Sequence, residues 1–574
     1  MAAALFGAAA QEPETPPAAS PPAAALATLH GEVRNGATGQ PLPRALVKIE
    51  GDADTGALTD GEGRFEIPAV PLGPQAIRVV KPGFLDRPSL AGAAIEGVVG
   101  PAHNVLVAPE MPDLVFTLAP TSSIRGQIEL STGDPAQGID LNLLRRSVED
   151  GRAVWKPVGW TKTGAEGAYR FAGLADGVYA IYTAPALESE PAAMLVDAAS
   201  TAKVARAGYA SVFYPNARDL AGAAHIQISG GEQAQANLTL TLEPFHTVAA
   251  EVVFPGVSRV GGANAASPGA NLTALVMDAQ GRILPYNAEY DQTTKTLQAT
   301  LPDGVYSLLV TMILQRPAAA SAGNPATIEA EPFTGSVEFS LAGHDPAHLR
   351  IPISSARANP IQATVDRSGP LPASDPRGMV MVMLSQAGGQ SGEWIDDGMV
   401  SAYASGAAPG PLETAYTLPG QYWVHTHVAQ KGLCEASFTA GGTSLAREPL
   451  AVGVSGATAP LALALRDGCS RLTLGLPQSL ATASGGEEPF YTVYVVPDFD
   501  STVDVEPVTL RPSTGGSFTL QDLTPGRYHV YAFDAPVRLE YRNPAVLAAL
   551  PNPSQAVTLS PGASANLVVE VPGR

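Results

Sequence analysis

The sequence is poor in charged residues, in aromatic residues and in long apolar runs. Charged residues make up 15% and aromatic residues 6% of its 574 positions. The sequence has 34 Lys and Arg and 54 Asp and Glu, which gives a formal net charge of -20. No basic run is present, which argues against a nucleic acid partner, because phosphate binding needs clustered Lys and Arg. After the first ten residues no segment reaches about 18 apolar residues, so we expect no transmembrane segment.

Motifs of the common enzyme classes are also missing. The sequence has no Gly-x-Ser-x-Gly elbow and no glycine-rich phosphate loop, and none of its nine His is followed by Glu three positions later. His425 and His427 share one face of a predicted strand, but with no acidic or cysteine neighbour in sequence they are more typical of a solvated or satisfied pair than of a metal site. We therefore predict no catalytic residue, no metal site and no cofactor.

The sequence has only two cysteines, and they lie within the same predicted domain. Cys434 and Cys469 are the only two in the chain. An even count within one domain of an exported chain favours a disulfide between them, whereas a cytosolic chain would keep two buried thiols. We prefer the disulfide.

The N-terminal segment also indicates export. Residues 1–10 read MAAALFGAAA and end in small residues that suit a cleavage site, although the usual basic start is missing. The alternative is a disordered Ala-rich tip. The Pro/Ala-rich stretch that follows is typical of a stiff tether. We expect an extracytoplasmic location, periplasmic, secreted or on the cell surface.

The rest of the chain consists of repeated short strands. Residues 59–80 (TDGEGRFEIPAVPLGPQAIRVV) alternate apolar and polar positions between Gly and Pro turns, which predicts a half-buried antiparallel sheet. A turn of the form Leu…Gly-x-Tyr recurs about every 100 to 130 residues, a period that fits a whole β-sandwich. The repeated tyrosines are suited to tie their hydroxyls to the preceding loop. They are Tyr179, Tyr306, Tyr422 and Tyr528.

Opening and closing strands recur with the same period and predict the domain boundaries. We expect an all-β chain, a tandem array of about five antiparallel β-sandwich domains of transthyretin or immunoglobulin type. Their predicted limits are 1–28 for the export segment and tether, then 29–120, 121–245, 246–357, 358–470 and 471–574. Linkers are almost absent, which predicts a rod of abutting domains. Helical patterns are restricted to 191–207 and 543–550.

The first of these domains resembles a known family. The stretch 30–84 (HGEVRNGATGQPLPRALVKIEG…TDGEGRFEIPAVPLGPQAIRVVKPGF) is similar to the carboxypeptidase regulatory-like domain, a transthyretin-like sandwich related to Cna-B and starch-binding-like folds. The whole chain resembles long exported bacterial proteins built of such modules. In metallocarboxypeptidases this domain is the non-catalytic appendage, and the resemblance implies a chain without enzymatic activity.

Two tryptophans supply the candidate ligand site. Trp155 and Trp160 flank a Pro-Val-Gly segment, and two exposed rings there would form a stacking platform for a sugar. The alternative, which we favour from sequence, places one ring in the core and the other on the surface. Three functions are left open: binding of carbohydrate or cell-envelope glycan, a rigid surface stalk or adhesin-like spacer for protein partners, and an accessory chain of a peptidase or glycosidase system.

Overall fold

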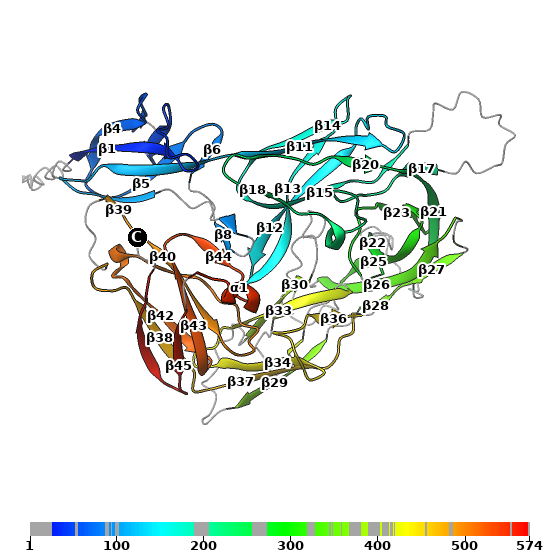
Figure 1. Cartoon of the computed structure of the whole chain (residues 1–574). Helices are drawn as coiled ribbons and strands as arrows, with labels where there is room; N and C mark the ends of the chain where they lie inside the picture. The colour runs from blue at the N-terminus through cyan, green and yellow to red at the C-terminus, as the bar shows by residue number, and fades with distance from the viewer. Residues whose placement is uncertain are drawn as a thin grey trace, which may run out of the picture.

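The chain is described here by a computed structural model. The structure describes residues 26–571 except 52–54, 87–90, 93–94, 98–102, 189–205, 255–271, 280, 318–327, 344–345, 347, 357–358, 367–379, 388–401, 404–411, 414–416, 418, 454–455, 481–485 and 552–553. Nearly all regular elements of the described residues are β-strands, and they are arranged as tandem sandwiches, which confirms the predicted all-β class (Figure 1). The export segment and tether, and most of the predicted helix at 191–207, lie outside these residues.

One strand arrangement is repeated in every sandwich. The opening strand pairs with the closing strand in parallel, as β1 (Leu26–Asn35) does with β10 (Leu114–Pro120). The same parallel pairing recurs for β11 with β19 and β20, β21 with β27, β29 with β37, and β38 with β46. In the second sheet of each sandwich, the strand that follows the repeated glycine turn pairs antiparallel with an earlier strand. The parallel pair is a feature that the predicted antiparallel pattern does not include.

The first two sandwiches each pack two sheets around one hydrophobic cluster. The first has β4-β1-β10-β6 and β3-β2-β5-β9, with β2 (Leu46–Ile49), β3 (Gly56–Leu58), β4 (Arg64–Pro71), β5 (Gly73–Val80), β6 (Phe84–Asp86) and β9 (His103–Val107). The second has β14-β11-β19 with β20, and β13-β12-β15-β18: β11 (Ser122–Leu130), β12 (Asp140–Glu149), β13 (Arg152–Lys162), β14 (Ala168–Leu174), β15 (Gly177–Thr183), β18 (Ile226–Ile228), β19 (Gln233–Gln235) and β20 (Leu238–Leu240). A 3-10 helix, η1 (Leu220–Gly222), precedes β18.

The third sandwich takes strands from beyond its predicted limits. Its sheets are β16-β17-β21-β24-β23 with β27, and β22-β25-β26-β28. The strands are β16 (Ala186–Leu187), β17 (Arg206–Tyr209), β21 (Leu242–Val253), β22 (Leu272–Asp278), β23 (Ala288–Asp291), β24 (Thr296–Pro302), β25 (Gly304–Pro317), β26 (Ile328–Leu341), β27 (Leu349–Pro352) and β28 (Ser354–Ser355). Strand β21 runs without a break through the predicted cut at residue 245.

The last two sandwiches follow the same plan. The fourth has β32-β29-β37-β34-β35 and β31-β30-β33-β36: β29 (Pro360–Asp366), β30 (Val380–Gln386), β31 (Ala402–Tyr403), β32 (Leu412–Glu413), β33 (Gly420–Val428), β34 (Cys434–Ala440), β35 (Thr443–Ser444), β36 (Leu450–Val452) and β37 (Leu461–Arg466). The fifth has β42-β38-β46 and β41-β40-β43-β45: β38 (Ser470–Gly475), β40 (Tyr491–Pro497), β41 (Val508–Leu510), η2 (Pro512–Thr514), β42 (Ser517–Leu523), β43 (Gly526–Phe533), β45 (Gln555–Leu559) and β46 (Ser564–Val568).

Local sequence chemistry accounts for several of these elements. In β4 the buried Phe65 and Ile67 alternate with exposed Arg64 and Glu66, so the strand has one core face. The helix α1 (Pro544–Ala548) begins where the sequence predicts, because the side chain of Asn543 accepts a hydrogen bond from the Ala545 amide and Pro occupies the first turn.

The repeated tyrosines are buried at the start of their strands. The Tyr179 hydroxyl donates to the Ala175 carbonyl at 2.7 Å, and the Tyr528 hydroxyl donates to the Thr524 carbonyl at 2.6 Å. Each bond closes the loop that the sequence pattern predicts, and it satisfies a polar group that would otherwise be buried without a partner.

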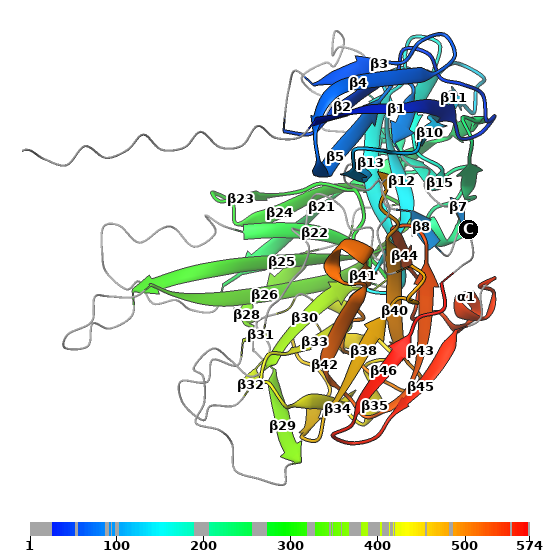
Figure 2. The ribbon, with the colours of Figure 1, turned by 90° about the vertical axis from the view of Figure 1, so that its left-hand side faces the viewer.

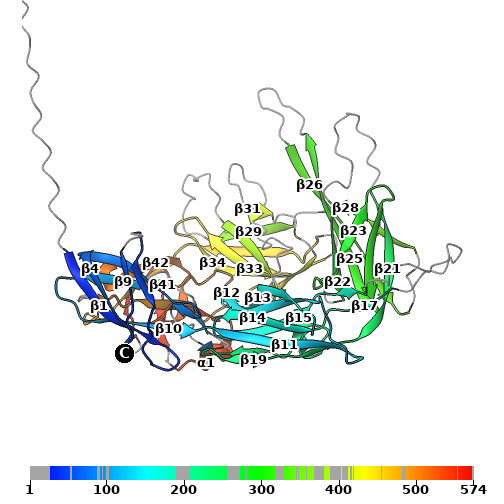
Figure 3. The same ribbon diagram turned by 90° about the horizontal axis from the view of Figure 1, so that it is seen from above.

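The five sandwiches are not arranged as a rod. The chain runs outward through the first and second sandwiches to the third and returns through the fourth and fifth (Figures 1 and 3). In the first sandwich, β9 pairs with β39 (Gly486–Glu487) of the fifth, and β8 (Ile95–Gly97) pairs with both β7 (Ala91–Gly92) and β44 (Val537–Leu539). Figure 2 shows β8 beside β44. The predicted rod is therefore wrong, because backbone hydrogen bonds join the first sandwich to the last.

Within the described residues, no helix has the length and apolar character needed to span a bilayer.

Candidate functional site

The two predicted tryptophans lie on one face of the second sandwich because of a β-bulge. Trp155 is paired with Arg146 and Trp160 with Asn142, and the register between β12 and β13 shifts where Leu143 and Leu144 pair. Without the shift, an odd spacing of five residues would place the two rings on opposite faces. The bulge adds one residue to β13 and returns Trp160 to the face of Trp155.

This face is aromatic and only partly covered. The Trp160 side chain is 74% exposed. Trp155 is half-buried, with its ring centroid 4.8 Å from that of His225, and packs on a small outer cluster that includes Leu144 and Phe213. Trp155 therefore packs against a small buried cluster outside the main core while Trp160 lies on the surface, an arrangement between the two alternatives stated from sequence. We call Trp155, Trp160 and Tyr182 the aromatic face.

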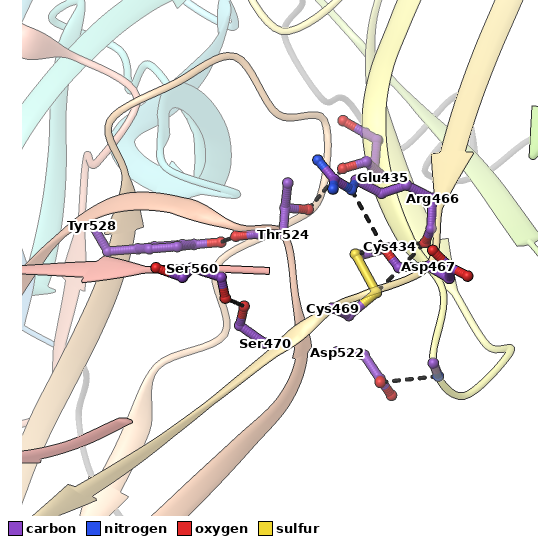
Figure 4. The surroundings of a disulfide bond; sticks show 11 residues. Cys434, Glu435, Arg466, Asp467, Cys469, Ser470, Asp522, Thr524, Tyr528 and Ser560 are labelled. Carbon is purple, nitrogen blue, oxygen red and sulfur yellow. Dashed lines mark hydrogen bonds between the residues drawn. A yellow bond between two sulfur atoms is a disulfide. The ribbon is translucent and has the colours of Figure 1, made fainter. Parts of the chain in front are cut away.

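Cys434 and Cys469 form the predicted disulfide (Figure 4). Cys434 opens β34 and Cys469 directly precedes β38, so the bond joins the fourth sandwich to the first strand of the fifth. Their Cα atoms lie 5.9 Å apart. Position in sequence predicts the pairing, but it does not reveal that the bond lies at the boundary of two sandwiches.

A buried glutamate beside the disulfide connects the same two sandwiches. The Thr502 amide donates to Glu435 Oε1 at 2.8 Å, and the Thr502 hydroxyl donates to Glu435 Oε2. The Thr524 hydroxyl donates to the Glu435 carbonyl at 2.7 Å, as Figure 4 shows. Desolvation raises the pKa of Glu435 and exceeds the lowering effect of the Thr502 hydrogen bonds.

The second, fourth and fifth sandwiches meet where the tip of the β12–β13 hairpin reaches the last two. Gly151 at this tip has a φ of +71°, and a Cβ there would lie 2.6 Å from ring atoms of Tyr541. The Arg542 amide donates to the Gly151 carbonyl at 3.0 Å, and Arg542 Nε donates to the Asp150 carbonyl at 3.1 Å. Only glycine provides both this conformation and this close approach.

Two arginines of the same hairpin hold the junction. Arg146 Nη2 lies 2.5 Å from Glu540 Oε2, and these side chains are 19% and 6% exposed. The Arg152 guanidinium lies 3.6 Å from the ring centroid of Trp423 and donates to the Ala446 carbonyl at 3.1 Å. A buried charge pair and a cation–π contact therefore join the second sandwich to the fifth and to the fourth.

At the centre of this junction His425 has acidic partners that its sequence neighbourhood does not predict. His425 Nδ1 lies 2.8 Å from Asp504 Oδ1 and 3.8 Å from Asp150 Oδ2. On the other side of the ring, Nε2 lies 2.7 Å from Ser385 Oγ. His425 is 3% exposed, whereas His427 is exposed to solvent, so the two imidazoles do not act as a pair.

Arg542 and Asp150 are further charged groups at this centre. Arg542 Nη2 lies 3.3 Å from Asp504 Oδ1, and burial together with the charge of Asp504 raises the pKa of Asp150. Asp150, His425 and Asp504 offer three ligand atoms within 4.8 Å of one another, a spacing that a metal ion could use. The guanidinium on Asp504 already supplies the positive charge there, so the group is better described as an interdomain hydrogen-bond network.

Comparison with known proteins supports the resemblance of the first sandwich. Residues 28–98 match the family model of the carboxypeptidase regulatory-like domain. No curated protein matches the sequence.

Similar solved structures include the Bacillus anthracis TIE protein (11% identity, 57% of this chain and 50% of that one, TM-score 0.16). A Streptococcal ancillary pilin is 13% identical over 57% of this chain and 98% of its own (TM-score 0.19). The major pilin subunit of Bacillus cereus is 9% identical over 78% and 98% (TM-score 0.14).

Proposed function

We propose that this chain is an extracytoplasmic scaffold that binds carbohydrate on the aromatic face of its second sandwich. The observation that carries the proposal is the pair of tryptophans on one solvent-facing surface. Strand geometry, at about 3.3 Å per residue, separates the paired positions 142 and 146 by about 13 Å. That span suits an oligosaccharide stacking one sugar ring on each tryptophan.

Neighbouring side chains support binding of an extended polar ligand. Tyr182 is paired with Asn142, the same residue that pairs with Trp160, and its ring lies 4.9 Å from that of Phe213. An aromatic surface bordered by an amide and a phenol gives both stacking area and hydrogen-bonding groups, which is the usual composition of a small-molecule binding surface.

The disulfide supports the extracytoplasmic location. Disulfides persist in oxidising compartments and are rare in the cytosol, where thiols are kept reduced. The closed arrangement of the sandwiches supports the scaffold, because paired strands between the first and fifth domains restrict relative motion.

A glycan array on the purified full chain, followed by affinity electrophoresis in the retained polysaccharide, tests the binding role. We expect Trp160→Ala and Trp155→Ala each to reduce retention by at least about twofold to tenfold, since stacking on one ring contributes about 0.5–1.5 kcal/mol beyond its area. Phe518→Ala removes an exposed aromatic ring from the fifth sandwich and serves as the matched control. Unchanged retention in both tryptophan variants would refute the proposal.

A scaffold for protein partners is the second candidate. The closed arrangement favours it, because a rigid body presents its loops in fixed positions. It predicts that no glycan is retained and that a pull-down from cell-envelope extract depends on the folded chain.

A further inference from the structure

Three side chains at the junction form a continuous hydrogen-bonded chain that the proposed binding role does not use. Ser385 Oγ lies 2.7 Å from His425 Nε2, and His425 Nδ1 lies 2.8 Å from Asp504 Oδ1. Ser385 is on β30, His425 on the neighbouring strand β33, and Asp504 on the segment between β40 and β41 of the fifth sandwich. The order serine, histidine, carboxylate is that of an activated hydroxyl nucleophile.

From this geometry we propose that Ser385 is a reactive nucleophile toward small carboxylic esters, with His425 as its general base and Asp504 as a positioning residue. This goes beyond binding and scaffolding, and it revises the expectation of a chain without catalytic residues. Such sites are defined by geometry and not by sequence order, so the absence of a Gly-x-Ser-x-Gly motif does not argue against it.

Strand register explains why the serine and the histidine meet. Met383 pairs with His425 and Ser385 with Trp423 in the antiparallel ladder between β30 and β33. Residues two apart share a face, so Ser385 and His425 are diagonal neighbours on the outer face of the sheet. The opposite face carries Leu384 and Val424, which are buried in the core of the fourth sandwich.

The fifth sandwich supplies the carboxylate through a fixed contact. The Thr426 amide donates to the Thr502 carbonyl at 3.0 Å, and Thr426 forms a parallel bridge with Val503. Asp504 follows directly and is thereby held against the adjacent imidazole. Because its carboxylate accepts from Nδ1–H, the Nε2 lone pair is left to accept the Ser385 hydroxyl proton.

A cationic donor lies over the strand partner of the nucleophile. The Arg152 guanidinium covers the ring of Trp423, the strand partner of Ser385, and its Nε has no hydrogen-bond partner among the described residues. Burial is the largest of the effects that lower the pKa of Arg152 to about 10. The guanidinium therefore stays charged near neutral pH. The guanidinium is held in place by Trp423 and by the Ala446 carbonyl, which leaves its Nε–H as a charged donor suited to stabilise an oxyanion.

The reaction balances as an acyl transfer followed by hydrolysis. Ser385 Oγ attacks the ester carbonyl carbon while its proton passes to His425 Nε2, giving a tetrahedral oxyanion and an imidazolium paired with Asp504. Collapse of the oxyanion breaks the ester C–O bond, and the departing alkoxide takes the proton from Nε2. Water then attacks the acyl-serine by the same proton route, releases the carboxylic acid and restores the hydroxyl.

Phosphonylation of the full oxidised chain by diisopropyl fluorophosphate tests the proposal, with peptide mass spectrometry to locate the adduct. Attack on phosphorus expels fluoride and leaves a stable seryl adduct. We expect one adduct per chain, on Ser385, formed at least about 100-fold faster than on the exposed Ser131. Ser385→Ala should lose the adduct, and Ser131→Ala should leave the labelling rate unchanged.

Two further variants separate chemistry from structure. His425→Gln should reduce the labelling rate about 100-fold or more. Asp504→Asn should lower the maximal labelling rate while the reagent concentration for half-maximal rate stays the same, whereas a merely structural role would change both. Hydrolysis of p-nitrophenyl acetate should follow the same order of variants.

Two labelling results at Ser385 would overturn the proposal. Absence of an adduct on Ser385 in the folded chain refutes it, as does an adduct that forms equally fast in the urea-unfolded chain. If His425→Gln does not fold, as judged by its thermal transition, the Asp504→Asn kinetics decide. An unchanged maximal rate in that variant would also refute the assignment.

Discussion

Removal of the disulfide between Cys434 and Cys469 should destabilise the fourth sandwich by about 4 kcal/mol. The bond closes a loop of 35 residues. In the chain-entropy treatment this loop restricts the unfolded chain by about 13 cal/mol/K, which is about 4 kcal/mol at 25 °C. The perturbation is the double variant Cys434→Ala with Cys469→Ala, and reduction of the unchanged chain is its chemical counterpart.

Hydrogen exchange read by mass spectrometry is the suitable assay, because a chain of several domains does not unfold in one step. Peptides from β37 should lose about 4 kcal/mol of protection in the double variant. Peptides from β5 in the first sandwich should change by less than about 0.5 kcal/mol, since distant sites are independent. They provide an internal control within the same molecule.

Two results would refute this reasoning. A loss below about 1 kcal/mol in β37 would mean that the loop is already restricted in the unfolded state. An equal loss in all five sandwiches would mean that the closed arrangement, and not the fourth sandwich, is the cooperative unit.

Three other perturbations test the interdomain contacts. Arg146→Met leaves the buried Glu540 without its cationic partner and should cost about 3–5 kcal/mol, measured by chemical denaturation. Glu435→Gln should remove a pH dependence: the raised pKa means that stability is full below the ordinary value of 4.5 and is lost as pH rises through the folded value, which thermal unfolding from pH 4 to 8 will detect. Gly151→Ala should displace the hairpin tip from Tyr541 and cost about 1–3 kcal/mol, visible as faster hydrogen exchange in both segments.

Matched controls make these tests specific. Arg447→Met breaks an ion pair with Asp500 in which the arginine is 75% exposed, so it should change stability by no more than about 1 kcal/mol. A loss as large as that of Arg146→Met would contradict the argument from burial. A pH dependence that persists in Glu435→Gln would show that another group titrates, and an unchanged exchange rate in Gly151→Ala would show that the hairpin tip is not closely packed.

The sequence predicted the elements that depend on local chemistry. The alternation of apolar and polar residues predicts β4, and the capping residue Asn543 predicts the start of α1. The position of the repeated tyrosines predicts the hydrogen bonds that the hydroxyls of Tyr179 and Tyr528 donate. Each of these depends on residues within a few positions of one another, where spacing determines geometry. The disulfide was predictable because the chain has only one possible pair.

The sequence did not predict the features that depend on residues far apart in the chain. The strands that join the first sandwich to the fifth are two to five residues long, too short for a recognisable alternation. The bulge beside Trp160 depends on the register with β12, which no local pattern specifies. Ser385 and His425 meet through the register of two strands that are about 40 residues apart in sequence, and Asp504 reaches them only because the fifth sandwich packs on the fourth, so no motif search brings the three together.

The pairing of β8 with β44 has a consequence for synthesis of the chain. Residue 97 and its partner Val537 are 440 positions apart. At a translation rate of about 5–20 residues per second, strand β8 waits about 20–90 s before the strand that pairs with its open edge exists. An uncovered edge is a template for association with other chains. We expect nascent chains truncated before residue 537 to need a holding chaperone, while the complete chain does not.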